Sequence, residues 1–196
     1  VCKKIKSKNV NNATYFNVVG IIYRRLGLLD EAVRNSKRAI QLDEGMLAAK
    51  MNIANINLQK GDIYSAIKLL EIIVKEEPLY QEAKANLALA YKNFGKLERA
   101  LKTYQELNFS DPGGAKARFN YSTTLITIGD FKEGWGYYEN RWKVSPGNKV
   151  IWPFQGRPLW KGEKGKRVVL WKEQGVGDDI IFLGLVSEVK EMCSSL

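Results

Sequence analysis

Apolar side chains recur at helical spacing in short stretches that are separated by glycines. Around Gly95, for example, apolar residues occupy positions 87, 89, 90 and 91 before the glycine and positions 97, 100, 101 and 104 after it. Intervals of three and four residues are typical of an amphipathic helix. Because glycine readily takes the left-handed conformation that ends a helix, the pattern predicts two helices joined by a short turn.

This pattern repeats at a constant interval along the chain. Glycines stand at positions 27, 61, 95 and 129, and prolines follow at a constant offset at positions 78, 112 and 146. A small residue lies five positions after each glycine, where it lets two helices approach closely: Ala32, Ala66, Ala100 and Gly134. One helix pair cannot bury its apolar stripe alone, but stacked pairs can. The sequence therefore predicts an all-α superhelix of four helix-turn-helix repeats, over residues 13–46, 47–80, 81–114 and 115–148.

The repeats resemble the tetratricopeptide repeat (TPR) family over residues 13–146. The likeness rests on the period, on the prolines and on a small residue inside each first helix: Gly20, Ala54, Ala88 and Ser122. The sequence departs from the family pattern at Glu44, at Asn57 and Leu125, and at Gly134. We interpret these departures as drift within a solenoid. The resemblance implies that the first helices line a concave groove.

Residues one period apart occupy the same place in successive repeats, so a recurring polar residue forms a ladder along one face. Asn52, Asn86 and Asn120 form such a ladder on the first helices. A carboxamide offers both a donor and an acceptor, which match one peptide unit of a guest. The ladder is similar to the one in O-GlcNAc transferase that holds an extended polypeptide. The alternative is that these asparagines bond to one another or to water and only solvate the groove.

A second ladder consists of Lys50, Lys84 and Arg118, two residues earlier in each repeat. It predicts positive charge on a rim of the first helices, to which Arg24, Arg25, Lys92 and Lys116 could add. An acidic or carboxyl-terminated peptide is then the favoured guest. The alternative is a solvated face on which the lysine stems cover apolar surface.

The composition excludes several classes of site. The chain has no histidine, which removes Ser-His and Cys-His nucleophile pairs and the usual zinc sites. Its two cysteines, Cys2 and Cys193, lie near opposite ends of the chain and do not predict a disulfide framework. We expect no metal and no cofactor. The chain lacks both a continuous apolar run long enough to span a membrane and a signal-peptide core, so we expect a cytoplasmic protein with no membrane partner.

The net charge of +10 raises the question of nucleic-acid binding. Residues 1–46 carry nine basic and four acidic side chains, and four of the basic ones are lysines in the first eight residues. We interpret residues 1–12 as a flexible basic tail. Diffuse charge can attract nucleic acid, but the sequence contains no recognisable element that reads a groove. We therefore expect no nucleic-acid partner.

The fourth repeat is rich in aromatic residues, with Trp135, Tyr138 and Trp142 on one predicted helix face. The preferred interpretation is that this helix packs under the segment that follows, and the alternative is a sugar- or base-stacking platform. Residues 149–166 contain prolines and tryptophans without helical period and predict a linker.

The pattern changes character over residues 167–196. An apolar run at 168–171 predicts a strand, a turn follows with Gly175 and Gly177, and residues 178–192 predict a helix. This order is that of an incomplete α/β fragment, in which the two glycines could bring the backbone close to a ligand. The residues Gly134, Trp135 and Trp142, with later matches through Phe182, make this part similar to bacterial GT-B glycosyltransferase-like domains that follow TPR repeats, which are related to O-GlcNAc transferase and the heptosyltransferases.

That resemblance implies that Asp178 corresponds to a proposed general base, and the alternative is an ordinary helix N-cap. A complete GT-B enzyme has two full lobes, whereas only the short segment 167–196 follows the linker. We therefore expect a non-catalytic TPR scaffold that binds an extended peptide. The alternative is the acceptor-binding part of a glycosyltransferase. We also expect that the C-terminal fragment could join two copies into a homo-oligomer.

Overall fold

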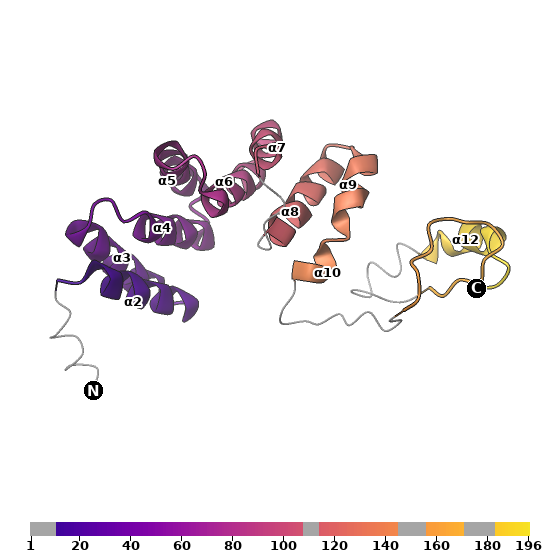
Figure 1. The fold of residues 1–196 in the computed structure, drawn as a ribbon, viewed down its shortest axis with the longest axis horizontal. Coiled ribbons are helices and arrows are strands. Elements are labelled where there is room, and N and C mark those ends of the chain that lie inside the picture. The colour runs from indigo at the N-terminus through magenta and orange to yellow at the C-terminus, as the bar shows by residue number, and fades with distance from the viewer. Residues whose placement is uncertain (1–10, 108–113, 145–155, 171–182) are drawn as a thin grey trace. The chain divides into compact units, whose positions relative to one another are not determined.

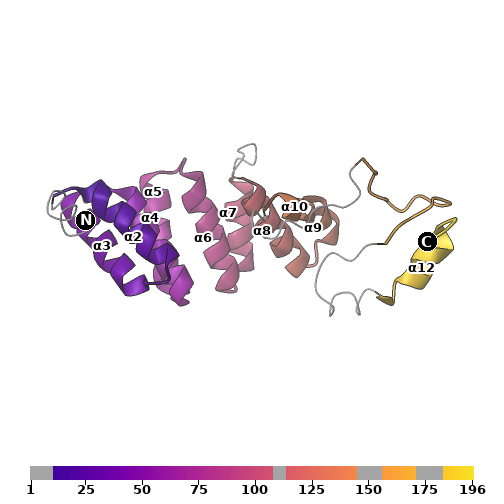
Figure 2. The ribbon, with the colours of Figure 1, turned by 90° about the horizontal axis from the view of Figure 1, so that it is seen from below.

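The computed structural model describes residues 11–107, 114–144, 156–170 and 183–196. The chain divides into two compact units, Val1–Val144 and Ser145–Leu196. The first unit contains helix pairs that follow one another in chain order (Figures 1 and 2). Among the described residues there is no β-strand, only one isolated bridge. The predicted all-α solenoid of four helix-turn-helix repeats is confirmed.

Each repeat contributes a first helix and a second helix. The first helices are α2 (Ala13–Arg25), α4 (Leu47–Lys60), α6 (Gln81–Asn93) and α8 (Gly114–Thr127). The second helices are α3 (Leu29–Leu42), α5 (Ile63–Glu76), α7 (Leu97–Gln105) and α9 (Phe131–Tyr138), the last followed by the short α10 (Arg141–Val144).

Local signals in the sequence set the helix ends. The four glycines between first and second helices have φ values of 76°, 81°, 80° and 91°, in the left-handed region that the pattern predicted. Side chains cap several helix starts: Asn12 accepts from the Tyr15 amide, Asp62 from Ser65 and Asp130 from Glu133. These caps satisfy backbone donors that the helix itself leaves free. The bond to Ser65 holds the pKa of Asp62 below its usual value.

Stacking of the helix pairs produces one continuous core. Ala54 of α4, Leu70 and Ile73 of α5 and Tyr104 of α7 are fully buried in it. Each large aliphatic side chain buried in this way contributes roughly 1.5–3 kcal/mol. The core connects repeats two, three and four, so none of them is an independent folding unit.

The first helices lie on the inner side of the stack. Each of them contacts the next first helix along the chain, α2 with α4, α4 with α6 and α6 with α8, whereas no comparable contact joins consecutive second helices in the described repeats. Elements that approach one another line the inner side of a curved stack. The first helices therefore occupy the side that the TPR resemblance implied for them, and a groove on that side stays a prediction.

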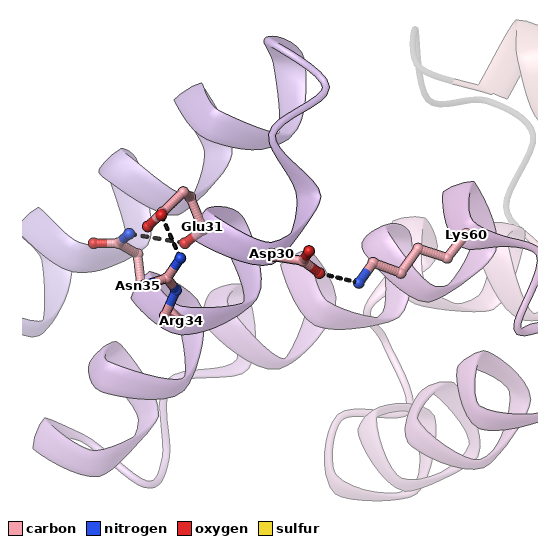
Figure 3. A network of polar contacts seen from close by, with 5 residues as sticks. All are labelled: Asp30, Glu31, Arg34, Asn35 and Lys60. Atoms are coloured by element: carbon pink, nitrogen blue, oxygen red, sulfur yellow. Dashed lines mark hydrogen bonds and ion pairs between the residues drawn. The ribbon is translucent and has the colours of Figure 1, made fainter.

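Surface contacts also join neighbouring repeats. At the end of α4, the Lys60 Nζ donates to Asp30 Oδ1 on α3 at 2.6 Å, and within α3 the Glu31 side chain pairs with Arg34 (Figure 3). The Asp30 side chain is exposed, and the contact with Lys60 lowers its pKa. Exposed ion pairs of this kind contribute little to stability.

The second unit contains the helix α12 (Val186–Met192) and one parallel bridge between Arg167 and Ser195. The predicted helix ends at Met192, as expected, but a turn at positions 184 and 185 interrupts its described part. Described positions 168–170 do not form the predicted strand. The Val168 amide donates to the Ser195 carbonyl at 3.0 Å, next to the bridge, and the pairing does not extend into a ladder. A ladder needs a partner strand, and the described C-terminal residues supply only this bridge.

Candidate protein-binding surface

Polar side chains connect the first helices along the inner side of the solenoid. Three hydrogen bonds cross between consecutive first helices: Arg24 Nε to Asn52 Oδ1 at 2.8 Å, Asn86 Nδ2 to Asn55 Oδ1 at 2.9 Å and Lys92 Nζ to Thr123 Oγ1 at 2.6 Å. We call these six residues the inner polar track. The track joins all four repeats.

Asn52 is the most deeply placed member of the track, with 2% of its surface exposed. Its Nδ2 donates to the Ser36 hydroxyl of α3 at 2.7 Å, while its oxygen accepts from Arg24. Gly20 makes room for this arrangement, because a Cβ atom there would lie 2.7 Å from Ser36 Oγ and 3.0 Å from Asn52 Nδ2. The prediction of an open three-rung ladder is therefore wrong at Asn52, which is buried between helices.

Asn86 and Asn120 are half-buried and differ from Asn52 in their surroundings. The bond from Asn86 to Asn55 uses one N–H of an amide group that carries two. The Asn120 main-chain carbonyl accepts hydroxyl bonds from Thr123 and Thr124. Whether these two asparagines bind a peptide stays a prediction.

The predicted cationic rim is turned toward the protein itself. Lys50 Nζ pairs with Glu76 at 2.8 Å and Lys84 Nζ lies 3.9 Å from Glu106, with 17% and 13% of the lysine side chains exposed. Arg118 Nε donates to Asn140 Oδ1 at 2.8 Å. In each case the partner belongs to the second half of the same repeat. The two lysines therefore pair with carboxylates of their own repeats and are largely buried, which matches neither an open cationic rim nor the solvated face of the alternative interpretation.

Positive charge on the inner side resides instead on Arg24 and Lys92, which occupy the same place in repeats one and three. Their described hydrogen-bond partners, Asn52 and Thr123, are neutral, and neither cation forms an ion pair within the described residues. Burial lowers the pKa of the Lys92 ammonium. A partly desolvated cation with a neutral partner is a favourable place for a guest carboxylate.

Sequence reasoning missed Asn55 and Thr123. These two residues share one place in repeats two and four, where Ile21 and Leu89 stand in repeats one and three. The search for a residue recurring in every repeat therefore passed over them. A search for polar residues at twice the repeat interval would have found this pair.

The aromatic cluster of the fourth repeat is partly exposed. Trp135 and Tyr138 meet edge to face with ring centroids 5.0 Å apart, and 51% of Trp135 is exposed. The Arg141 guanidinium lies over Tyr138 at 4.7 Å and over Trp142 at 4.5 Å. The expected cover of this cluster by a following segment stays a prediction.

The candidate residues of the C-terminal fragment, Gly175, Gly177 and Asp178, lie outside the described residues. In the described ranges, no group of three or more acidic or cysteine side chains is placed to hold a metal ion. None of the helices that the structure describes is both long enough and apolar enough to span a membrane.

Comparisons with known proteins address the repeats. A family model described as the bacterial transcriptional activator domain matches residues 26–109. The FlbA protein of Caulobacter vibrioides is 25% identical over 181 residues, which are 89% of this chain and 30% of FlbA. The chain thus spans less than a third of the length of that relative.

Solved structures share the fold. A crystal structure of MamA superposes with a TM-score of 0.60 at 22% identity, covering 72% of this chain and 82% of MamA. MamA from Desulfovibrio magneticus gives 0.61 at 20% identity, with 72% and 80% covered. PilF from Pseudomonas aeruginosa gives 0.62 at 13% identity, with 67% and 60% covered. With the repeat period and the stacked helix pairs, these likenesses show that the chain has a TPR-like helical-repeat fold.

Proposed function

We propose that this chain is a non-catalytic interaction scaffold that binds an extended, acidic protein segment along the inner polar track. The observation that carries the proposal is the set of three hydrogen bonds between consecutive first helices, two of which hold a cation against a neutral partner. Helical-repeat proteins commonly use their extended concave surface for binding.

The pair of Asn55 and Asn86 is suited to a peptide backbone. A guest peptide unit offers one N–H and one C=O, and the two carboxamides supply the complementary groups. Recognition of this kind depends on the backbone and tolerates many guest side chains. Because the three hydrogen bonds of the track lie at successive junctions between repeats, a guest must be extended to reach all of them.

Lys92 and Arg24 provide the preference for acidic guests. A guest carboxylate that replaces the Thr123 hydroxyl at Lys92 exchanges a neutral partner for a charged one, and charge-assisted hydrogen bonds are roughly twice as strong as neutral ones. The attraction at exposed parts of the track would weaken with salt. We expect one carboxylate of the guest to lie near Lys92, where repeats three and four meet, and another near Arg24, where repeats one and two meet.

Fluorescence anisotropy with two extended peptides of equal length, one rich in Glu and one rich in Lys, tests the proposal. We expect the acidic peptide to bind more tightly, and Lys92→Met to reduce its affinity about tenfold, which corresponds to about 1.4 kcal/mol. Lys37→Met is the control, because Lys37 is exposed on α3. Equal binding of both peptides, or equal effects of both substitutions, would overturn the acidic preference.

A further inference from the structure

Two exposed aromatic rings meet where repeats two and three join. Tyr64 lies at the start of α5 and Phe94 is the C-cap of α6, and their ring centroids are 6.4 Å apart. The two residues are 54% and 44% exposed. Unlike a single exposed apolar residue, two rings in contact offer a partner a continuous apolar surface.

The same two places hold an ion pair one repeat earlier. One period before Tyr64 and Phe94 stand Asp30 and Lys60, whose side chains meet at 2.6 Å (Figure 3). That exposed ion pair shows that the contact between repeats at this place does not need aromatic rings. Departures from a local pattern that packing does not require are expected at functional sites.

A lysine lies against each ring. Lys68 Nζ is 4.5 Å from the ring centroid of Tyr64, and Lys96 Nζ is 5.0 Å from that of Phe94. Both lysines are exposed, and neither forms an ion pair within the described residues. A cation–π contact holds each ammonium group beside its ring and leaves its positive charge available to a carboxylate. We call these four residues the aromatic-lysine patch.

Lys96 takes the place of a helix cap. In repeats two and four the equivalent residues are Asp62 and Asp130, whose side chains accept from main-chain amides at the starts of α5 and α9. Lys96 is the N-cap of α7 and makes no such bond. An aspartate in this place would stabilise the helix start. Repeat three thus lacks a stabilising cap and has a positive charge beside the ring instead.

We propose that the aromatic-lysine patch is a second docking site, which binds an acidic protein segment through an aromatic side chain packed on the two rings and carboxylates at the two lysines. Charge complementarity favours this partner, because a cation lies beside each ring and the whole chain carries a net charge of +10. A nucleic-acid strand stacks its bases on open ring faces, whereas an ammonium group lies over one face of each ring here. The patch shares no residue with the inner polar track, and neither site requires the other.

Fluorescence anisotropy with two labelled peptides of equal length and charge tests this proposal. Both peptides are rich in glutamate, and one carries a central tryptophan where the other carries alanine. We expect the parent chain to bind the tryptophan peptide about tenfold more tightly. The double variant Tyr64→Asp with Phe94→Lys, which reproduces the ion pair of the preceding repeat, should keep its thermal midpoint and lose this preference. The control Ile72→Ser alters a side chain that is 50% exposed elsewhere on α5 and should keep the preference.

A second variant, Lys96→Asp, separates binding from stability. It introduces the cap that repeats two and four possess, so we expect the thermal midpoint to rise while the preference for the tryptophan peptide falls. This variant keeps both rings and therefore also resolves a loss of stability in the double variant. A preference equal to that of the parent would overturn the proposal.

Three further outcomes would overturn it. Equal affinity of the parent for the two peptides would mean that the rings bind no aromatic side chain. A preference that persists in the double variant would place the aromatic contact elsewhere. A single-stranded oligonucleotide that binds the parent but not the double variant would assign the patch to nucleic acid. Lys92→Met, in the inner polar track, should weaken both peptides by the same factor, so that failure of the inner site is distinguished from failure of the patch.

Discussion

The guanidinium of Arg24 and the carboxamide of Asn52 form the polar junction between repeats one and two. Arg24 Nε donates to Asn52 Oδ1 at 2.8 Å, and the other end of the same carboxamide donates to Ser36 at 2.7 Å. One buried side chain thus links α2, α3 and α4. Asn52 therefore holds three helices together, a structural role that differs from the guest-binding role predicted for the asparagine ladder.

Replacing Asn52 with alanine should therefore destabilise the fold. The substitution leaves the buried Ser36 hydroxyl without its described partner, and an unsatisfied buried group costs about 1–3 kcal/mol. Asn86→Ala should cost less, because Asn86 is only half-buried. Urea unfolding followed by circular dichroism measures both, with Lys60→Met as a surface control expected to match the parent. Equal costs for Asn52 and Asn86 would contradict this assignment.

Gly20 should tolerate no side chain. Its Cβ position lies 2.7 Å from Ser36 Oγ, so Gly20→Ala should destabilise, because the cost of overpacking, about 1–3 kcal/mol, exceeds the gain in helix propensity of up to about 1 kcal/mol. Gly136→Ala is the matched control, since a Cβ there meets nothing within 4 Å and only the propensity gain remains. Thermal unfolding of the pair should give shifts of opposite sign, and a gain for both would refute the steric argument.

Stability should fall at alkaline pH, partly through Tyr91. Burial and, second, its 2.5 Å hydrogen bond to Glu71 raise the pKa of the Tyr91 hydroxyl from 10.0 to about 12. A raised pKa means that the folded state holds the proton after the unfolded state has lost it, so this stabilisation is complete below pH 10 and is lost as pH rises toward 12. Burial also raises the pKa of Tyr104. Unfolding free energy measured across this range should fall less steeply in Tyr91→Phe; an unchanged slope would exclude Tyr91.

The sequence was sufficient to predict the solenoid because its determinants are local and recur. The glycines of each turn and the small residues between paired helices, such as Ala32 and Ala66, have one physical role in every repeat. Their recurrence at a constant interval made the fold class readable. The absence of a strand near Val168 could not be predicted in this way, because strand formation depends on a partner strand that is distant in the sequence.

The candidate site was harder to predict because equivalent positions have different neighbours. Asn52 and Asn86 share a place in the repeat, but only Asn52 meets a serine on the preceding second helix. Lys50 was expected on a charged rim, yet Glu76, at the end of the second helix of the same repeat, pairs with it. Periodicity identifies the position of a side chain, whereas the partner that it meets depends on residues outside the repeat pattern.

The inner polar track makes a prediction for Thr123. Thr123→Val removes the described hydroxyl partner of Lys92 while keeping the size of the side chain. Because a guest carboxylate would no longer compete with this hydroxyl, the acidic peptide should bind at least as tightly as to the parent, whereas Lys92→Met should weaken it. Titration calorimetry at low and high salt distinguishes these effects. Parallel losses in both variants would indicate damage to the fold instead of loss of a charge.

The most direct test of guest binding is nuclear magnetic resonance of the side-chain amide groups during titration with the acidic peptide. We expect the amide signals of Asn55 and Asn86 to shift together with main-chain signals of α4, α6 and α8, while those of α5 and α7 change little. Shifts confined to the second helices, or no shifts at saturating peptide, would contradict guest binding along the inner polar track.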